Sequence, residues 1–410
     1  MSTEKRSLQG IFLALAITLG VATGFTSSVP LMEFADFVSA SFIKFLKLIS
    51  MPMIFLSVVS AISGMQSMDE VKNLGGRVLC YTLSTTLIAA ATALGLFLLI
   101  NPVHPNIGAG TEVVIQESTS YLTHISNLIP DNILRPFIEE NVIGVLFLSA
   151  LLSLSILTLP QDKQKSLHQL FSSLFAALMQ VTRWVLRIMP LGIWAFVALF
   201  TADIRAGMDA SSLLLYLAVV VTANLVQGFV VLPLMLKWKG ISPFKSMKGM
   251  MPALSVAFFS KSSSAALPMS MRCAEENMGV SRKVSNFTLP LCSTINMNAC
   301  AAFILTTVLF VAMSHGVTFS TLEMISWIFI ATVAALGNAG VPMGCYFLSS
   351  ALLASMNVPL NILGVILPVY TMIDMLESAI NVWSDSCVAA VVDKDLKKEE
   401  AAKEFAPAAS

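Results

Sequence analysis

The sequence predicts an all-α polytopic membrane protein with eight transmembrane helices and two re-entrant helical hairpins. Its 410 residues are 56% hydrophobic and only 12% charged, whereas soluble domains carry about 25% charged residues. The mean hydropathy is +0.81. Long apolar runs alternate with short polar connections, and a stripe of charged residues interrupts the last run. These observations indicate a membrane-spanning chain with a polar site inside the bilayer.

Eight apolar segments are long enough to supply the roughly 20 residues that cross a bilayer as a helix. No stretch is left for a separate soluble domain, so we expect a single domain over residues 1–410. We expect the spans at 9–29, 38–65, 75–101, 138–158, 169–203, 211–237, 284–312 and 361–392.

Lysine and arginine gather in alternate connections, which predicts the topology. The segments that contain them, expected in the cytoplasm with both termini, are 1–6, 66–77, 160–168, 237–248, 272–283 and the tail 393–410. The connections without them, expected outside, are 27–37, 101–120, 314–321 and 355–361, and the turn 204–210, which has only Arg205, is expected outside too. This alternation holds only if the segments 249–278 and 322–357 each enter and leave the membrane on the same side.

Each of these two segments has a tip that breaks a helix, SKSSSAALP at 260–268 and GNAGVP at 337–342. Such a backbone cannot face lipid, because each unpaired amide costs several kcal/mol there. A hairpin followed by a long helix therefore occurs twice, entering from opposite faces. This is the outline of an inverted repeat, whose broken helices meet near the bilayer midplane in many secondary transporters.

The last span carries a row of polar residues, Asp374, Glu377, Ser378, Asn381 and Asp385. At about 100° per residue they share an arc of about 100° on one helix face. Lipid cannot solvate carboxylates, so this face must meet protein, water, a cation or a substrate. The row predicts a binding site.

Other classes of protein are less well supported. An ion channel would also place carboxylates in membrane helices, but it would not need two paired hairpin tips. No Ser/His pair or metal cluster lies at membrane depth, so we do not expect an enzyme. The net charge is zero, which implies no nucleic-acid partner. The six cysteines lie in or beside apolar segments, and we expect free thiols.

Four motifs resemble the dicarboxylate/amino acid:cation symporters, the family that includes the glutamate transporters. They are the two hairpin tips, FTLPLCSTINMN at 287–298 and DMLESAINVWSD at 374–385, and weaker similarity covers nearly the whole chain. The resemblance implies sodium as the coupling ion and a homotrimer in a plasma membrane, the inner membrane of a bacterium.

The resemblance also implies a rigid scaffold and a mobile transport domain that moves as an elevator. The scaffold would lie mainly within 1–110 and 111–240. The transport core would be 245–392, with hairpins 249–278 and 322–357 and helices 284–312 and 361–392, joined by the third helix 75–101.

Individual site residues follow from the same resemblance. Ser262, Ser263 and Ser264, helped by Asn381, would approach the substrate α-carboxylate, and Asp374 would hold the α-amino group. The outer gate would lie at Ala339, Gly340 and Val341, and Cys300, Glu377 and Ser378 complete the expected substrate site. The expected sodium ligands are Thr85, Thr86, Cys292, Thr294, Asn296, Met297, Asn298, Asn381 and Asp385.

Two departures from the family pattern affect the expected substrate and the expected number of coupled sodium ions. Glu377 stands where members that carry acidic substrates have an arginine, and two like charges 4 Å apart repel by about 4 kcal/mol at an effective dielectric constant of 20. The sequence therefore favours a small neutral amino acid, as in the bacterial serine/threonine symporter branch. A basic amino acid, or an acidic one or dicarboxylate coupled to sodium or protons, stays an alternative. Asn298 replaces an aspartate, which predicts fewer coupled sodium ions.

Overall fold

The computed structural model describes residues 3–26, 28–64, 74–103, 130–139, 141–205, 211–338 and 342–404. Within these ranges the chain is helical, with short turns and no strand, so the predicted all-α class is confirmed. In the described part of the chain, six helices are long and apolar enough to cross a membrane: Val29–Ser60, Gly76–Ile100, Gln161–Ala202, Ser211–Trp238, Arg282–Ser314 and Asn361–Glu399. The two other expected spans correspond to shorter apolar helices, Ala14–Thr26 and Gly144–Leu157.

Four helices from the first half of the chain pack along one another: α1 (Thr3–Thr26), α2 (Val29–Ser63), α7 (Val142–Leu157) and α8 (Gln161–Arg205). Two of them are longer than expected. Residues 29–37 and 161–168, predicted to lie in connections, instead begin α2 and α8. A proline in the first turn of α2 is compatible with this start, because its missing N–H would have no partner there.

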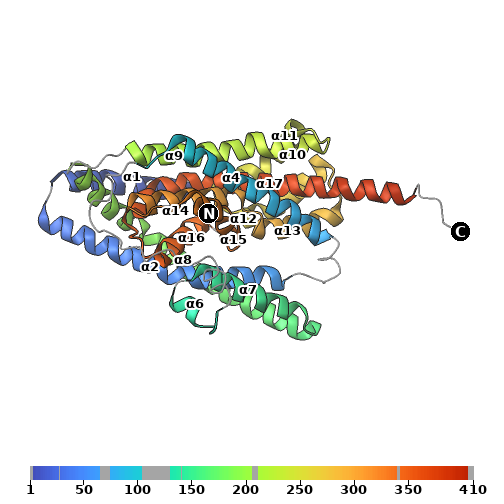
Figure 1. The fold of residues 1–410 in the computed structure, drawn as a ribbon, viewed down its shortest axis with the longest axis horizontal. Helices are drawn as coiled ribbons and strands as arrows, with labels where there is room; N and C mark the ends of the chain where they lie inside the picture. The colour runs from blue at the N-terminus through green and yellow to red at the C-terminus, as the bar shows by residue number, and fades with distance from the viewer. Residues whose placement is uncertain are drawn as a thin grey trace.

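The helix α17 (Asn361–Glu404) runs through the middle of the molecule (Figure 1). It contacts the two helices of the first hairpin, α11 (Pro243–Ser260) and α12 (Ser263–Met278), and the two parts of the broken helix that follows, α13 (Arg282–Ile295) and α14 (Asn298–Ser314). The helix α4 (Gly76–Ile100) packs against α14 and α15 (Thr321–Leu336). The expected span 211–237 is α9 (Ser211–Val226), a π-helical segment η2 (Gln227–Val231) and α10 (Leu232–Trp238).

Both predicted hairpin segments are pairs of helices. The first is α11 (Pro243–Ser260) and α12 (Ser263–Met278), which pack together and are joined at Lys261, whose φ of 57° ends α11 in the left-handed region. The second is α15 (Thr321–Leu336) and α16 (Gly344–Ser355), of which α16 packs on α14 and α2. At the start of α15, Ser320 and Glu323 form a capping box, which satisfies two otherwise unpaired N–H groups.

The expected helix 284–312 is interrupted at Asn296 and Met297. The backbone leaves the helical region there, with φ −98° and ψ 71° at Asn296 and φ −107° and ψ 61° at Met297. The break separates α13 (Arg282–Ile295) from α14 (Asn298–Ser314). Carbonyl groups at the end of α13 and N–H groups at the start of α14 thereby become available to other partners.

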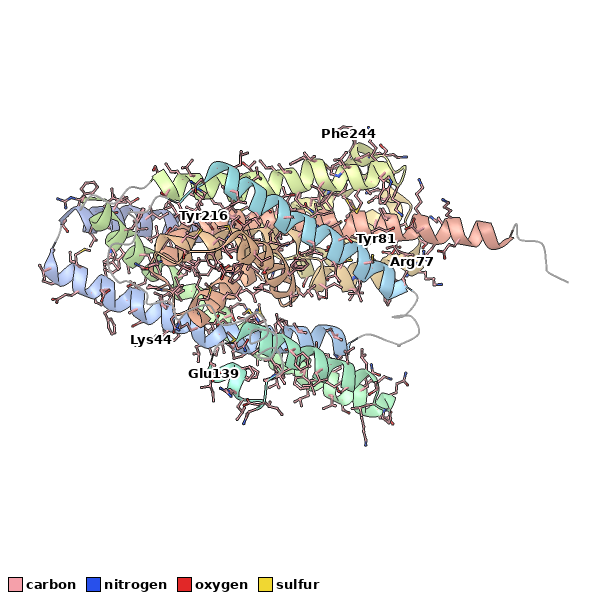
Figure 2. The ribbon with its side chains drawn as sticks, viewed as in Figure 1. Lys44, Arg77, Tyr81, Glu139, Tyr216 and Phe244 are labelled. Carbon is pink, nitrogen blue, oxygen red and sulfur yellow. A yellow bond between two sulfur atoms is a disulfide. The ribbon has the colours of Figure 1, made fainter. Side chains whose placement is uncertain are left out.

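Connections predicted to be cytoplasmic contact one another at the C-terminal end of α17. Lys239 forms a 2.8 Å salt bridge with Asp395, Tyr81 donates to the same carboxylate at 2.6 Å, and Asp393 accepts from the Ser281 N–H at 3.0 Å. Figure 2 shows this end of α4 beside α17. The tail, expected to begin at 393, is instead helical to Glu404, held by these contacts.

Connections predicted to lie outside also meet. His315 Nε2 lies 2.9 Å from Asn361 Oδ1, between the 314–321 and 355–361 segments. Arg205, at the end of α8, donates to the Phe25 carbonyl at 2.7 Å. These contacts are compatible with the topology that the charge pattern predicts, and the sides of the membrane stay a prediction.

Candidate functional site

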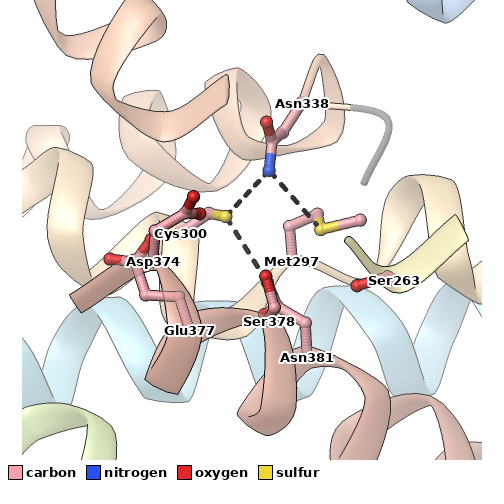
Figure 3. A pocket seen from close by; sticks show the side chains of 8 residues that line it. All are labelled: Ser263, Met297, Cys300, Asn338, Asp374, Glu377, Ser378 and Asn381. Carbon is pink, nitrogen blue, oxygen red and sulfur yellow. Dashed lines mark hydrogen bonds between the residues drawn. The ribbon is translucent and has the colours of Figure 1, made fainter. Parts of the chain in front are cut away.

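A pocket of about 200 Å³, including its opening, lies where the first hairpin, the broken helix, the second hairpin and α17 meet (Figure 3). All of the side chains that line it are buried. They are Ser263, Met297, Cys300, Asn338, Asp374, Glu377, Ser378 and Asn381. All but Asn338 are expected site residues, so folding brings together positions from four separate motifs.

The two carboxylates of the pocket have different surroundings. Asp374 Oδ2 accepts the Met343 N–H at 3.2 Å, from the tip of the second hairpin. Glu377 Oε2 accepts the Tyr370 O–H at 3.2 Å. Glu377 Oε1 is buried and has no hydrogen-bond partner among the described residues. The pocket therefore contains a carboxylate oxygen without a partner in the described part of the chain, and a buried acceptor of this kind is costly unless a ligand pairs with it.

Asn338, in the GNAGVP tip, lines the pocket although the sequence motifs did not identify it as a site residue. Its Nδ2 lies 2.9 Å from Cys300 Sγ and 3.7 Å from Met297 Sδ, and its Oδ1 is buried without a partner in the described part of the chain. The sequence of the tip could nevertheless have identified Asn338 as a site residue. Asn338 is the only polar side chain in a tip that must be buried, and such a group needs a partner.

The expectation of six free thiols is wrong for one pair. Cys300 and Cys345 form a disulfide between α14 and α16, with their Cα atoms 5.4 Å apart. The other cysteines, Cys80, Cys273, Cys292 and Cys387, are free. The two paired residues lie 45 positions apart, and only the packing of α16 on α14 places them together.

The three serines of the first hairpin tip have different positions. Ser263 opens α12 and lines the pocket, so this helix N-terminus, which favours negative charge, lies at the site. Ser262 caps the helix by accepting the Ala265 N–H at 3.2 Å, and Ser264 is exposed. The expected gate residues Ala339, Gly340 and Val341 lie outside the described residues.

Hydroxyl groups of α4 reach the start of α14. Thr86 Oγ1 donates to Asn298 Oδ1 at 2.7 Å, and Thr85 Oγ1 lies 3.3 Å from the same oxygen. Both hydroxyls also lie within 3.1 Å of carbonyl groups one turn earlier in α4. The expected contact between α4 and the broken helix is thus present, and the hydroxyls also bond to their own helix.

A buried polar cluster continues from the break to α17. Asn296 Nδ2 donates to Asp385 Oδ1 at 3.0 Å, and the Asn296 and Asn298 amides both donate to Ser384 Oγ, at 2.9 and 2.7 Å. Together with the two threonines, these groups form an oxygen-rich cluster. Hard cations favour oxygen ligands of this kind.

Other expected sodium ligands lie near the same break. Asn381 Oδ1 accepts the Ala299 N–H at 3.0 Å, which ties α17 to the first turn of α14. Cys292 Sγ lies 3.9 Å from the Thr82 hydroxyl. The Thr294 hydroxyl donates to the Leu291 carbonyl of its own helix at 2.7 Å, so its side chain makes a local bond.

Helices that break inside an apolar bundle, next to a buried polar pocket and an oxygen cluster, are the features of a secondary membrane transporter. Residues 10–395 match the sodium:dicarboxylate symporter family. The chain belongs to this family, which confirms the resemblance seen in the motifs. It is a family of transporters rather than enzymes, with sodium as the coupling ion, and the chain is an integral membrane protein.

Known members of the family resemble the chain along most of its length. Neutral amino acid transporter B(0) of Bos taurus is 26% identical, over 95% of this chain and 79% of that protein. The putative sodium-dependent excitatory amino acid transporter glt-6 of Caenorhabditis elegans is 27% identical, over 95% and 80%. Excitatory amino acid transporter 3 of Homo sapiens is 25% identical, over 96% and 87%. The relatives thus include transporters named for neutral and for excitatory amino acids.

Proposed function

We propose that this protein is a sodium-coupled symporter that imports a small neutral amino acid, such as serine, threonine or alanine. The free acceptor at Glu377 Oε1 carries the proposal. A substrate hydroxyl can donate to it, whereas a second substrate carboxylate would be repelled by about 4 kcal/mol at 4 Å and an effective dielectric constant of 20. Neutral transporters among the relatives support the same substrate class.

The remaining groups of the pocket suit the common part of an amino acid. Asp374 holds the ammonium group, and Ser263 at the N-terminus of α12, with Asn381, holds the carboxylate. Ser378 and Cys300 complete the wall. Ala339–Val341 and the neighbouring Asn338 form the outer gate.

Sodium binds at the polar cluster beside the pocket. Asp385 and Asn296 supply charge and oxygen to one ion, and the Thr294 carbonyl and Met297 sulfur contribute to another. Asn298 brings no charge, so a further site with Thr85 and Thr86 is weak or absent. The ratio of sodium to serine flux tests this, because a ratio equal to that of an acidic-substrate member measured alongside would contradict it.

Transport proceeds by an elevator movement within a homotrimer. The core 245–392 and helix 75–101 move with the substrate, while the other helices before 240 form the scaffold. The grouping of lysine- and arginine-containing connections at the C-terminal end of α17 supports cytoplasmic termini. The membrane is the plasma membrane of a bacterium, its inner membrane.

Uptake of labelled serine into proteoliposomes tests the proposal. Unlabelled serine, threonine, alanine, aspartate and arginine are added as competitors, with and without a sodium gradient. We expect the three neutral amino acids to compete, and only when sodium is present. Competition by aspartate alone or by arginine alone would assign an acidic or a basic substrate, and sodium flux without coupled uptake would indicate a channel.

A further inference from the structure

Three side chains from three helices converge at one side of the pocket: Cys300 of α14, Cys345 of α16 and Glu377 of α17. Their two sulfur atoms and one carboxylate oxygen all lie within 4.8 Å of one another. Each residue is about 1% exposed. Cys345 has no part in the proposed transport site, so its position in this cluster calls for a separate explanation.

The surroundings of the cluster also point to a ligand. Glu377 Oε1 is buried and has no partner within the described ranges of the chain. Nearby, the Asn338 amide nitrogen lies 2.9 Å from Cys300 Sγ, 3.6 Å from Cys345 Sγ and 3.7 Å from Met297 Sδ. Three sulfur atoms thus surround one small donor group, close to an unpaired carboxylate oxygen.

We propose that Cys300, Cys345 and Glu377 form a binding site for a soft d¹⁰ cation, such as Zn²⁺ or Cd²⁺, when the two cysteines are reduced. Thiolate ligands select such ions over sodium. Tetrahedral zinc bonds of about 2.3 Å to sulfur place two thiolates about 3.8 Å apart. The carboxylate oxygen, which lies within 4.8 Å of both sulfur atoms, needs to approach them by about 1 Å, and the two sulfur atoms separate to about 3.8 Å once their bond is reduced.

The chemistry of this site follows from the disulfide. A phosphine reduces the disulfide by donating two electrons and becomes a phosphine oxide, while water supplies the oxygen and the two protons that complete the thiols. The divalent ion then displaces these two protons and is held by two thiolates and the Glu377 carboxylate. A small-molecule disulfide reverses the reduction by thiol exchange, which releases two small thiols and abolishes the site.

A bound ion is expected to block transport. It would join the second hairpin to both α14 and α17, and it would occupy the carboxylate that we assign to the substrate hydroxyl. The metal and the substrate would therefore compete. Metal binding itself does not depend on which amino acid is carried, so failure of this proposal and failure of the proposed function can be distinguished.

Cadmium binding to the purified full-length protein tests the site directly. The protein is reduced with a phosphine, desalted without oxygen and titrated with Cd²⁺, and the ultraviolet charge-transfer band of cadmium thiolate is recorded with the bound metal per chain. We expect the reduced protein to bind one more Cd²⁺ than the Cys300→Ser/Cys345→Ser double variant. Glu377→Gln is expected to weaken this binding by about tenfold or more.

Cys273→Ser is the matched control, because Cys273 is a buried free cysteine in α12. It is expected to keep the band. Inhibition of uptake by Zn²⁺ should appear in the reduced protein and decrease as substrate rises. Equal bands in the reduced wild-type protein and the double variant would overturn the proposal. Absence of a band from protein shown to have all six thiols free would overturn it too.

Discussion

Glu377→Gln is expected to change the substrate preference of the pocket more than its affinity for serine. The Glu377 side chain is 1% exposed, so water screens its charge poorly. A second substrate carboxylate 4 Å away is opposed by about 4 kcal/mol at an effective dielectric constant of 20. Since about 1.4 kcal/mol corresponds to a factor of ten, this repulsion weakens aspartate binding by almost a thousandfold. Glutamine has nearly the same shape and removes the charge.

The affinity for serine is expected to fall much less in the same variant. Its hydroxyl exchanges a hydrogen bond to a charged acceptor, worth about 1.5–3 kcal/mol, for one to a neutral acceptor, worth about 0.5–1.5 kcal/mol. The difference of about 1 kcal/mol is roughly a fivefold loss of affinity. The aspartate-to-serine ratio of inhibition constants is therefore expected to fall by at least about tenfold, with a limit of about a few thousandfold if the full repulsion is relieved and serine loses its fivefold.

Competition against labelled serine in proteoliposomes at saturating sodium measures this ratio. Glu276→Gln is the matched control, because Glu276 is exposed on α12 and pairs with Arg272 at 3.0 Å, and its ratio should equal that of the wild-type protein. An unchanged ratio in Glu377→Gln would refute the reasoning, since the carboxylate would then not act on the substrate side chain.

Three further substitutions test other contacts. Tyr370→Phe removes the donor to Glu377 Oε2, and we expect about a tenfold rise in the KM for serine; an unchanged KM would contradict this role. Asp385→Asn is expected to raise the sodium concentration for half-maximal uptake at least about tenfold, and equal sodium dependence would exclude Asp385 from the ion site. Ser320→Ala breaks the capping box with Glu323, so thermal unfolding should show a free energy of unfolding lower by about 1 kcal/mol, with the KM for serine unchanged. Unaltered stability would show that the cap contributes nothing.

The sequence predicted the helical class well, because burial of apolar length is a property of each segment by itself. Helix ends were predicted less well. The first turns of α2 and α8 and the extension of α17 contain polar residues that resemble loops, and tertiary contacts such as Lys239–Asp395 hold the last of these in a helix.

The candidate pocket was predicted in part. Polar residues at membrane depth, such as Asp374 and Glu377, are unusual enough to identify from the sequence, because lipid cannot solvate them. The contribution of Asn338 was not predicted, although its burial in a hairpin tip could have been anticipated. Ser262 and Ser264 look equivalent to Ser263 in the sequence, and only the start of α12 decides which of the three faces the pocket.

The sequence by itself determined that this chain is a membrane protein of the symporter family, with charged groups committed to a site in its last helix. Charge and unpaired backbone groups are costly in lipid, so these features can be recognised in each segment of the sequence by itself. Only the tertiary structure decided that one Glu377 oxygen has no partner among the residues that the structure describes, and that Cys300 and Cys345 meet beside it. Both depend on how α14, α16 and α17 pack, which no single segment specifies.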